Sequence, residues 1–223
     1  MEPVRIVHFS DVLCTWAYVS QIRLDELLTQ FPEQIEVETR FVNIFGNVPG
    51  KMKSQWGAKG GIRGYAEHVR TVIEQFDHVD MHPAAWIDAM PQSSLPSHVF
   101  LCAARRLEEQ GAIGPGDTRR AAWAVRKAFF QQAVDVSQYA ALMEIAQRTG
   151  LPVADIERLL QSGEAYAALA EDLELARDLS VRASPSLIFN EGRQKLIGNV
   201  GYGIIEANVR ELLQGPTGDH SWC

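Results

Sequence analysis

The sequence of 223 residues has little cysteine, no excess of basic residues and no long apolar run. Its three cysteines are too few, and odd in number, for a disulfide framework, so we expect a reducing, cytoplasmic setting. The net charge of −7 argues against nucleic acid as a partner. No stretch approaches the roughly 18 apolar residues of a membrane span. Charged residues interrupt the N-terminal stretch, so we expect no secretory signal there.

The N-terminal part of the chain carries the pattern of a strand, a helix and a second strand. Residues 4–9 form a short apolar run, which is typical of a buried strand. Ser10 or Asp11 can then cap a helix that stops at Pro32. In residues 35–41 apolar and polar side chains alternate, as in a strand with one wet face. A right-handed crossover between the two strands would make them parallel.

The next segment, residues 43–64, is rich in glycine and in cations, and we expect it to be a loop. It contains six glycines together with Lys51, Lys53, Lys59 and Arg63. A loop of this length is either a functional lid or a mobile connection between two parts of the molecule. From about residue 62 to residue 179 the pattern is that of successive helices.

The C-terminal part has the pattern of a strand, a turn, a strand and a helix. Residues 186–189 and 194–197 are short strand-like runs separated by Asn-Glu-Gly, which predicts a hairpin. An amphipathic helix follows, and the last residues have the composition of a tail. Joined, the two terminal parts predict one small α/β sheet with a helix on each face. Because neither part alone buries both faces of its strands, the helical block must be an insertion.

Cys14 lies at the junction of the first strand and the first helix. Free backbone N–H groups and the positive end of the helix dipole favour a thiolate at such a position. The thiolate is the nucleophilic form of cysteine, so position alone makes Cys14 a candidate nucleophile. The alternative is an inert buried cysteine. For Cys102, within an apolar helical run, we expect core packing.

A proline at the entry to the third strand strengthens the case for Cys14. The sequence Arg182-Ala-Ser-Pro185 directly precedes residues 186–189. A proline is tolerated at the first residue of a strand. If the Ser184–Pro185 bond is cis, it would present the backbone of Ser184 to whatever binds at Cys14.

Three features together resemble the DsbA-like superfamily of thioredoxin folds. They are Phe9-Ser-Asp-x-x-Cys-x-Trp-Ala-Tyr18, the helical insertion, and the stretch from Asp178 to Asn190 with its Ser-Pro pair. The resemblance is strongest for the cytoplasmic FrnE-type branch, and kappa-class glutathione transferases and 2-hydroxychromene-2-carboxylate isomerases are relatives. It implies a thioredoxin-like domain over residues 1–60 and 180–215, an inserted all-helical domain over residues 61–179, and a tail over residues 216–223.

The resemblance assigns roles to residues in both motifs. Cys14 matches the attacking cysteine of a Cys-Pro-Trp-Cys type motif, Trp16 its tryptophan, and Pro185 the cis-proline beside the active site. Two residues depart from the family pattern: Thr15 replaces proline, and Ala17 replaces the second, resolving cysteine. The implied substrate-binding residues are Asp11, Thr15, Trp16, Ala17, Ser184, Pro185 and Asn199.

Ala17 narrows the chemistry that the motif can support. Without a second thiol, a mixed disulfide at Cys14 cannot be resolved from within the motif. An external thiol such as glutathione can resolve it, which gives single-cysteine exchange with a disulfide-containing protein or small molecule. Another cysteine of the protein can do so instead, and Cys223 in the tail is the candidate. A disordered tail without that role is the alternative.

The same residues leave two other functions open. Cys14 can be a binding residue, as serine is in the kappa-class and isomerase relatives, which implies a glutathione-dependent isomerase or transferase acting on a small electrophile. Those relatives carry Ser-Asp-Arg after the last strand, whereas residues 198–202 here offer Asn199 without a charged anchor. The third function is a non-catalytic binding module. We expect no tightly bound cofactor, no metal and no membrane or nucleic-acid partner, with glutathione as a candidate co-substrate and a homodimer as a candidate assembly.

Several histidines admit a functional interpretation. His8 is either a packed histidine or, at the end of the first strand, a group that assists Cys14. His98 opens a helix together with two serines that can cap it or line a cleft. A cluster before Pro83 has metal-ligating residue types without a matching spacing, so we expect a solvated turn there: Asp77, His78, Asp80 and His82.

Overall fold

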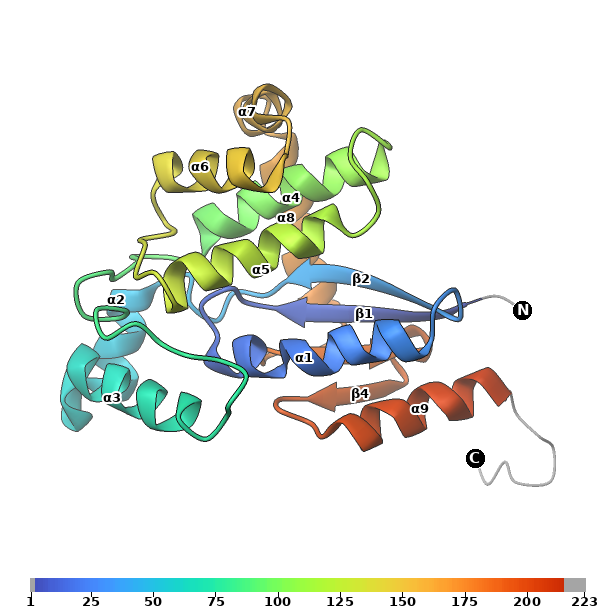
Figure 1. Cartoon of the computed structure of the whole chain (residues 1–223), viewed down its shortest axis with the longest axis horizontal. Helices are drawn as coiled ribbons and strands as arrows, with labels where there is room; N and C mark the ends of the chain where they lie inside the picture. The colour runs from blue at the N-terminus through green and yellow to red at the C-terminus, as the bar shows by residue number, and fades with distance from the viewer. Residues whose placement is uncertain (1–2, 215–223) are drawn as a thin grey trace.

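The computed structural model describes residues 3–214 and shows a mixed four-stranded sheet among helices (Figure 1). The strand order is β2-β1-β3-β4, with β1 at Val4–Ser10, β2 at Ile35–Phe41, β3 at Ser186–Phe189 and β4 at Gln194–Ile197. β1 and β2 are parallel, whereas β3 is antiparallel to both β1 and β4. The predicted strand–helix–strand unit, its parallel pairing and the C-terminal hairpin are therefore confirmed.

The two terminal helices lie on the same face of the sheet. Ile6 of β1 packs in one cluster with residues of α1 (Thr15–Gln30) and α9 (Tyr202–Gln214). Phe9, three residues along the same strand and so on its opposite face, packs instead against α8 (Glu164–Asp178). The expectation that the terminal parts place a helix on each face was wrong. The second face is covered by the last helix of the helical block.

The chain between β2 and α8 is mainly helical. Its elements are α2 (Val48–Lys51), the π-helical turn η1 (Met52–Trp56), the 3-10 turn η2 (Gly57–Lys59), α3 (Gly61–Ile73), α4 (Leu95–Glu109), α5 (Asp117–Phe130), α6 (Tyr139–Thr149) and α7 (Val153–Gln161). In Figure 1, α4 to α8 stack on one side of the sheet, and α2 and α3 lie beyond the end of β1 that leads to α1. In the same view α1 and α9 lie on the other side.

Residues 43–64 are not the loop that their glycine content suggested. From Val48 the backbone is helical through three short elements that lead into α3. Buried Val48 and Met52 anchor the segment, and the Trp56 ring meets the edge of Tyr65 with 5.1 Å between centroids. The glycine that matters most to the local course is Gly60, whose φ of 86° lets the chain turn between η2 and α3. Apolar anchoring overrides glycine composition in this segment.

A buried ion cluster ties the helical block to the sheet. Asp172 of α8 is fully buried and accepts hydrogen bonds from Arg105 of α4 (2.7 Å) and from Arg40 of β2 (2.9 Å). It also accepts from the backbone N–H of Phe41 at 3.0 Å. Cys102 lies against the same carboxylate and is fully buried, and burial raises the pKa of its thiol to about 12. The expected core role of Cys102 is confirmed.

We predict that Asp172→Asn destabilises the protein by about 3–5 kcal/mol, because it leaves two arginines beside a neutral amide in a buried site. Urea denaturation followed by circular dichroism measures the change. Glu171→Gln is the matched control: it removes the neighbouring carboxylate, which is exposed and pairs with Arg106 at 2.8 Å. We expect Glu171→Gln to lower the free energy of unfolding by less than about 1 kcal/mol. Equal unfolding midpoints for the two variants would contradict the role given to Asp172.

Candidate active site

The loop after β1 places Cys14 at the start of α1. The N–H of Cys14 donates to the carbonyl of Asp11 at 3.1 Å, which closes a turn. The carbonyl of Cys14 accepts the first helical hydrogen bond from Tyr18 at 3.0 Å. Cys14 is therefore itself the N-cap residue, without a capping bond from its side chain, and the helix begins at Thr15. The expectation that Ser10 or Asp11 caps this helix was wrong.

The structure brings Cys14 and the Ser-Pro motif into contact across 170 residues of sequence. The Ser184–Pro185 peptide bond is cis. The sulfur of Cys14 lies 3.0 Å from the carbonyl oxygen of Ser184. In return, the hydroxyl oxygen of Ser184 accepts a hydrogen bond of 2.9 Å from the N–H of Asp11. The two motifs thus form one unit held by two hydrogen bonds.

The carboxylate of Asp11 fixes three segments around Cys14. One oxygen accepts from the N–H of Leu13 at 3.0 Å. The other accepts from the N–H groups of Ile44 (3.0 Å) and Phe45 (2.8 Å) after β2, and from the hydroxyl of Ser94 (2.9 Å) at the start of α4. Asp11 is fully buried and does not line the cavity beside Cys14. Asp11 therefore holds these three segments together beneath the site.

His98 of α4 supports the same loop from below. Its Nε2 accepts a hydrogen bond of 3.2 Å from the N–H of Val12, and its ring stacks on Phe41 with 4.9 Å between centroids. Burial lowers the pKa of His98, so the ring is neutral and its Nε2 is free to accept. Neither His98 nor Ser94 lines the cavity beside Cys14.

A cavity of about 310 Å³ opens beside Cys14. Three of the predicted substrate-binding residues line it: Thr15, Trp16 and Ser184. Trp16 is 37% exposed, which is unusual for so large an apolar ring. The remaining wall comes from the segment after β2, from α3 and from the approach to β3: Ile44, Phe45, Lys51, Gln55, Trp56, Tyr65, His68, Val69, Val72, Arg182 and Ala183.

Apart from Cys14 and Tyr65, the ionisable side chains that line this cavity are all basic. Lys51, His68 and Arg182 line it, and no Asp or Glu does. Lys51 is held with its ammonium 4.8 Å from the centre of the Phe45 ring, a cation–π contact. Such a lining favours a ligand that carries carboxylate or other anionic groups.

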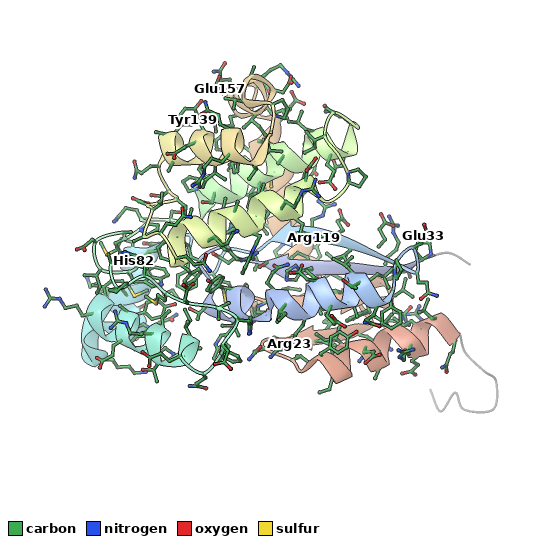
Figure 2. All side chains as sticks on the ribbon, viewed as in Figure 1. Arg23, Glu33, His82, Arg119, Tyr139 and Glu157 are labelled. Atoms are coloured by element: carbon green, nitrogen blue, oxygen red, sulfur yellow. The ribbon has the colours of Figure 1, made fainter. Side chains whose placement is uncertain are left out.

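The other predicted residues lie outside this cavity. Ala17 and Pro185 line a separate small cavity, of about 20 Å³, between α1 and the C-terminal hairpin. Asn199 accepts a hydrogen bond from Arg23 of α1, and Figure 2 shows Arg23 at the junction of α1 with the β4–α9 end of the molecule. The structure thus does not bring Asn199 to the Cys14 cavity. Cys223 lies outside the described residues.

Burial dominates the electrostatics of Cys14. The side chain is 6% exposed, and burial raises the pKa of its thiol above the ordinary value. Hydrogen bonds from Ser184 and from the N–H groups of Ala17 and Trp16 act in the opposite direction, and the charge of Asp11 raises the pKa further. The helix start therefore stabilises the thiolate as expected, but in the resting protein burial outweighs it.

Sequence reasoning missed the wall of the cavity opposite Cys14. Lys51 is one of the cations of the glycine-rich segment, and Arg182 stands next to the Ser-Pro motif. Tyr65 and His68 carried no signal in the sequence. Burial and the negative charges of Cys14 and Asp11 raise the pKa of Tyr65, so its phenol keeps its proton and stays a hydrogen-bond donor.

Residues 3–214 contain neither a metal-binding cluster nor a membrane-spanning helix. No group of three or more His, Cys, Asp or Glu side chains in this range is placed to hold a metal ion. None of the helices in the same range has the length and apolar character needed to cross a membrane.

A family model described as the DSBA-like thioredoxin domain matches residues 5–208. The chain belongs to this family. The match includes both motifs and the whole helical block, as the sequence predicted. The family contains thiol–disulfide oxidoreductases, and solved structures with this fold include a disulfide reductase and an isomerase.

Two curated relatives are ClpXP adapter proteins named SpxH. The protein from Halalkalibacterium halodurans is 24% identical over 222 residues, which cover 95% of this chain and 68% of that protein. The one from Bacillus licheniformis is 32% identical over 94 residues, which cover 40% of this chain and only 31% of that protein.

Solved structures share the fold at low sequence identity. A Nitrosomonas europaea protein assigned as a disulfide isomerase has a TM-score of 0.77 at 15% identity, over 96% of this chain and 98% of that one. The cytosolic disulfide reductase DsbM of Pseudomonas aeruginosa has 0.67 at 15%, over 92% and 98%. A 2-hydroxychromene-2-carboxylate isomerase has 0.61 at 13%, over 94% and 96%. At these identities the likeness shows the fold alone.

His8 of β1 lines the small cavity with Ala17 and Pro185. It is buried, and its Nδ1 has no hydrogen-bond partner among the described residues. Burial, together with the positive charge of Arg126, lowers its pKa from 6.5 to about 3. The ring is therefore neutral at physiological pH.

We predict that His8 makes the fold sensitive to acid. Its folded-state pKa is depressed, so the unfolded chain binds the extra proton, and stability falls as the pH drops from 6.5 toward 3. Thermal unfolding at several pH values in that window is the measurement. His8→Leu should flatten the decline, whereas His82→Gln, at an exposed position labelled in Figure 2, should not. Parallel declines in the wild type and His8→Leu would contradict this role.

Proposed function

We propose that the protein is a cytoplasmic thiol–disulfide exchange enzyme that works through Cys14 alone. The observation that carries the proposal is the position of the Cys14 sulfur, 3.0 Å from the carbonyl of the cis Ser184–Pro185 pair and open to the cavity. The other cysteine of the described residues, Cys102, is sealed in the core. Ala17 stands where a second thiol of the motif would be, so the reaction is completed by an external thiol, with Cys223 of the tail as the alternative.

The proposed reaction is a pair of disulfide exchanges. The Cys14 thiolate attacks one sulfur of the partner's disulfide, forms a mixed disulfide with it, and releases the other sulfur as a thiolate that takes up a proton. The thiolate of an external thiol then attacks the mixed disulfide, bonds to the partner's sulfur, and releases Cys14 as a thiolate. One disulfide has been exchanged for another, and no further oxidant or reductant is consumed.

The cavity supports glutathione as the external thiol. Glutathione carries two carboxylates, and Lys51, His68 and Arg182 surround the cavity with no acidic side chain among them. The carbonyl of Ser184 beside the sulfur can accept a backbone-like N–H from the bound peptide. A structure of the Pseudomonas aeruginosa DsbM, which has the same fold, was solved with GSH. The Pseudomonas aeruginosa protein is described as cytosolic, and the present chain contains little cysteine. Both points support a reducing compartment for this protein.

A glutathione-dependent isomerase is the second candidate. Four aromatic side chains line the cavity: Trp16, Phe45, Trp56 and Tyr65. They suit a flat aromatic electrophile, and the protonated Tyr65 hydroxyl can donate to its oxygen. In that reaction glutathione is bound without a disulfide to Cys14. The SpxH relatives instead favour a third possibility, a module that binds a protein partner without chemistry.

We predict that oxidised glutathione modifies Cys14 within minutes and that reduced glutathione removes the adduct. The attack needs only one thiol and an accessible disulfide. Peptide mass spectrometry locates and quantifies the adduct. Cys14→Ser should abolish it, while Cys223→Ser should leave it unchanged. If the adduct accumulates only in Cys223→Ser, the tail cysteine is the resolving thiol. If neither the wild type nor Cys223→Ser forms an adduct, the exchange function is wrong.

We also predict that Ala17→Cys converts the site to a two-cysteine mechanism. A thiol one helical turn after Cys14 can attack the mixed disulfide from within the chain. Oxidised glutathione should then leave an internal disulfide and only a transient adduct, detected as a loss of two hydrogens by intact mass. Ala17→Ser is the matched control and should keep the stable adduct. A stable adduct in Ala17→Cys would contradict the assigned place of the resolving position.

A further inference from the structure

Arg126 of α5 is a buried cation beneath the Cys14 loop. Arg126 is only 2% exposed. Its guanidinium donates to the hydroxyl of Ser10, the last residue of β1, and at 3.4 Å to the side-chain oxygen of Gln21 in α1. These two partners precede and follow Cys14 in the chain. The guanidinium therefore lies in the angle between the end of β1 and the first turns of α1.

This cation has no anionic partner in contact. Among residues 3–214 no carboxylate forms an ion pair with Arg126, and its Nε has no hydrogen-bond acceptor. By comparison, Arg105 of α4 is also buried but binds Asp172 at 2.7 Å. A buried charge without a partner costs stability, and replacing one by an apolar residue is commonly neutral or stabilising. Core packing alone gives no reason for an arginine at this position.

The charge of Arg126 acts on groups around the Cys14 loop. It disfavours protonation of His8 in β1 and of His98 in α4, whose Nε2 accepts from the N–H of Val12 in the loop. The negative groups that favour the charged form of Arg126 are the Cys14 thiolate, Asp11 and Asp25. Asp11 keeps its charge, but its two oxygens are occupied by four neutral N–H and O–H donors, and it forms no contact with the guanidinium. Cys14 lies in the chain between Ser10 and Gln21, the two residues that hold the guanidinium, so a thiolate formed there is attracted by this cation.

We propose that Arg126 is a positioning residue that supplies the buried positive charge for the Cys14 thiolate. It does not touch the reacting atoms and acts through the electrostatic field across the Cys14 loop. The inference rests on the proposed exchange function, because only a reaction through the thiolate needs this charge. It assigns an active-site role to the interior of the helical block. Two other basic side chains between β2 and α8, Lys51 and His68, line the open cavity.

Other charged groups around Cys14 set the background for a test. They are Asp11 in the loop itself, Tyr65 on α3, and Lys51, His68 and Arg182 at the cavity. Below pH 9 Arg126 remains a cation, because burial lowers its pKa only to about 10. Variation of the alkylation rate with pH between 6 and 9 therefore reports the thiol and not Arg126.

The test is the rate at which iodoacetamide alkylates Cys14 in the full-length protein, followed by peptide mass spectrometry. In Arg126→Met we expect the rate at neutral pH to fall about tenfold, as for a thiol pKa raised by about one unit. Arg126→Lys, which keeps a charge, should stay within about threefold of the wild type. Melting temperature should not fall in Arg126→Met, because an uncompensated buried charge is removed.

Arg119→Met is the matched control on the same helix. Arg119 lies two turns before Arg126, is partly exposed and is labelled in Figure 2. Its replacement should leave the Cys14 rate unchanged. If Arg126→Met does not fold, Arg126→Gln replaces it, since an amide can still donate to Ser10 but carries no charge. Rescue by lysine and not by glutamine identifies the charge, rather than the hydrogen bond, as the cause.

Two outcomes overturn the inference without touching the proposed function. One is a folded Arg126→Met or Arg126→Gln whose Cys14 is alkylated at the wild-type rate. The other is an Arg126→Lys that loses as much reactivity as Arg126→Met. If instead wild-type Cys14 reacts neither with iodoacetamide nor with oxidised glutathione, the exchange function fails, and the role of Arg126 falls with it.

Discussion

The geometry of the site depends on one buried carboxylate, that of Asp11. Four donors from three separate segments converge on it, and its own N–H holds Ser184. The loop that carries Cys14, the chain that enters the cavity wall after β2, and the start of α4 are fixed to a single point. A charge satisfied by N–H and O–H groups can be buried without a counter-ion in contact. The same bonds set the distance between Cys14 and the cis-proline loop.

The site combines a buried sulfur with positively charged surroundings. Burial keeps Cys14 protonated at rest, and a protonated thiol reacts slowly with small oxidants. The helix N–H groups and, in the role proposed above, Arg126 lower the cost of forming the anion. A reactive group of this kind is protected until a partner occupies the cavity. The exposed Trp16 at the rim gives such a partner an apolar surface to contact.

The sequence allowed prediction of the order of the elements, because that order follows from local patterns. The contact between Cys14 and Ser184–Pro185 joins residues 170 positions apart, and its prediction came from the resemblance to the DsbA-like superfamily. It did not allow prediction of which face each helix covers, since that depends on contacts between segments far apart. The helical course of residues 48–64 could not be predicted, because glycine content is a local property, whereas the burial of Met52 depends on tertiary contacts. Arg126 gave no signal either: beside an apolar helix face, a single arginine looks like a surface residue until the packing is known.

The shared face of α1 and α9 has a consequence for how this architecture can change. Phe9 and Ile188 on the opposite face rely on α8 for their cover, and Asp172 of that helix also binds the edge strand β2. The helical block therefore cannot be removed or exchanged as a unit without exposing this face of the sheet. Its innermost helix belongs to the same cooperative folding unit as the sheet. Diversification is freer in α6 and α7, which Figure 1 shows farthest from the strands.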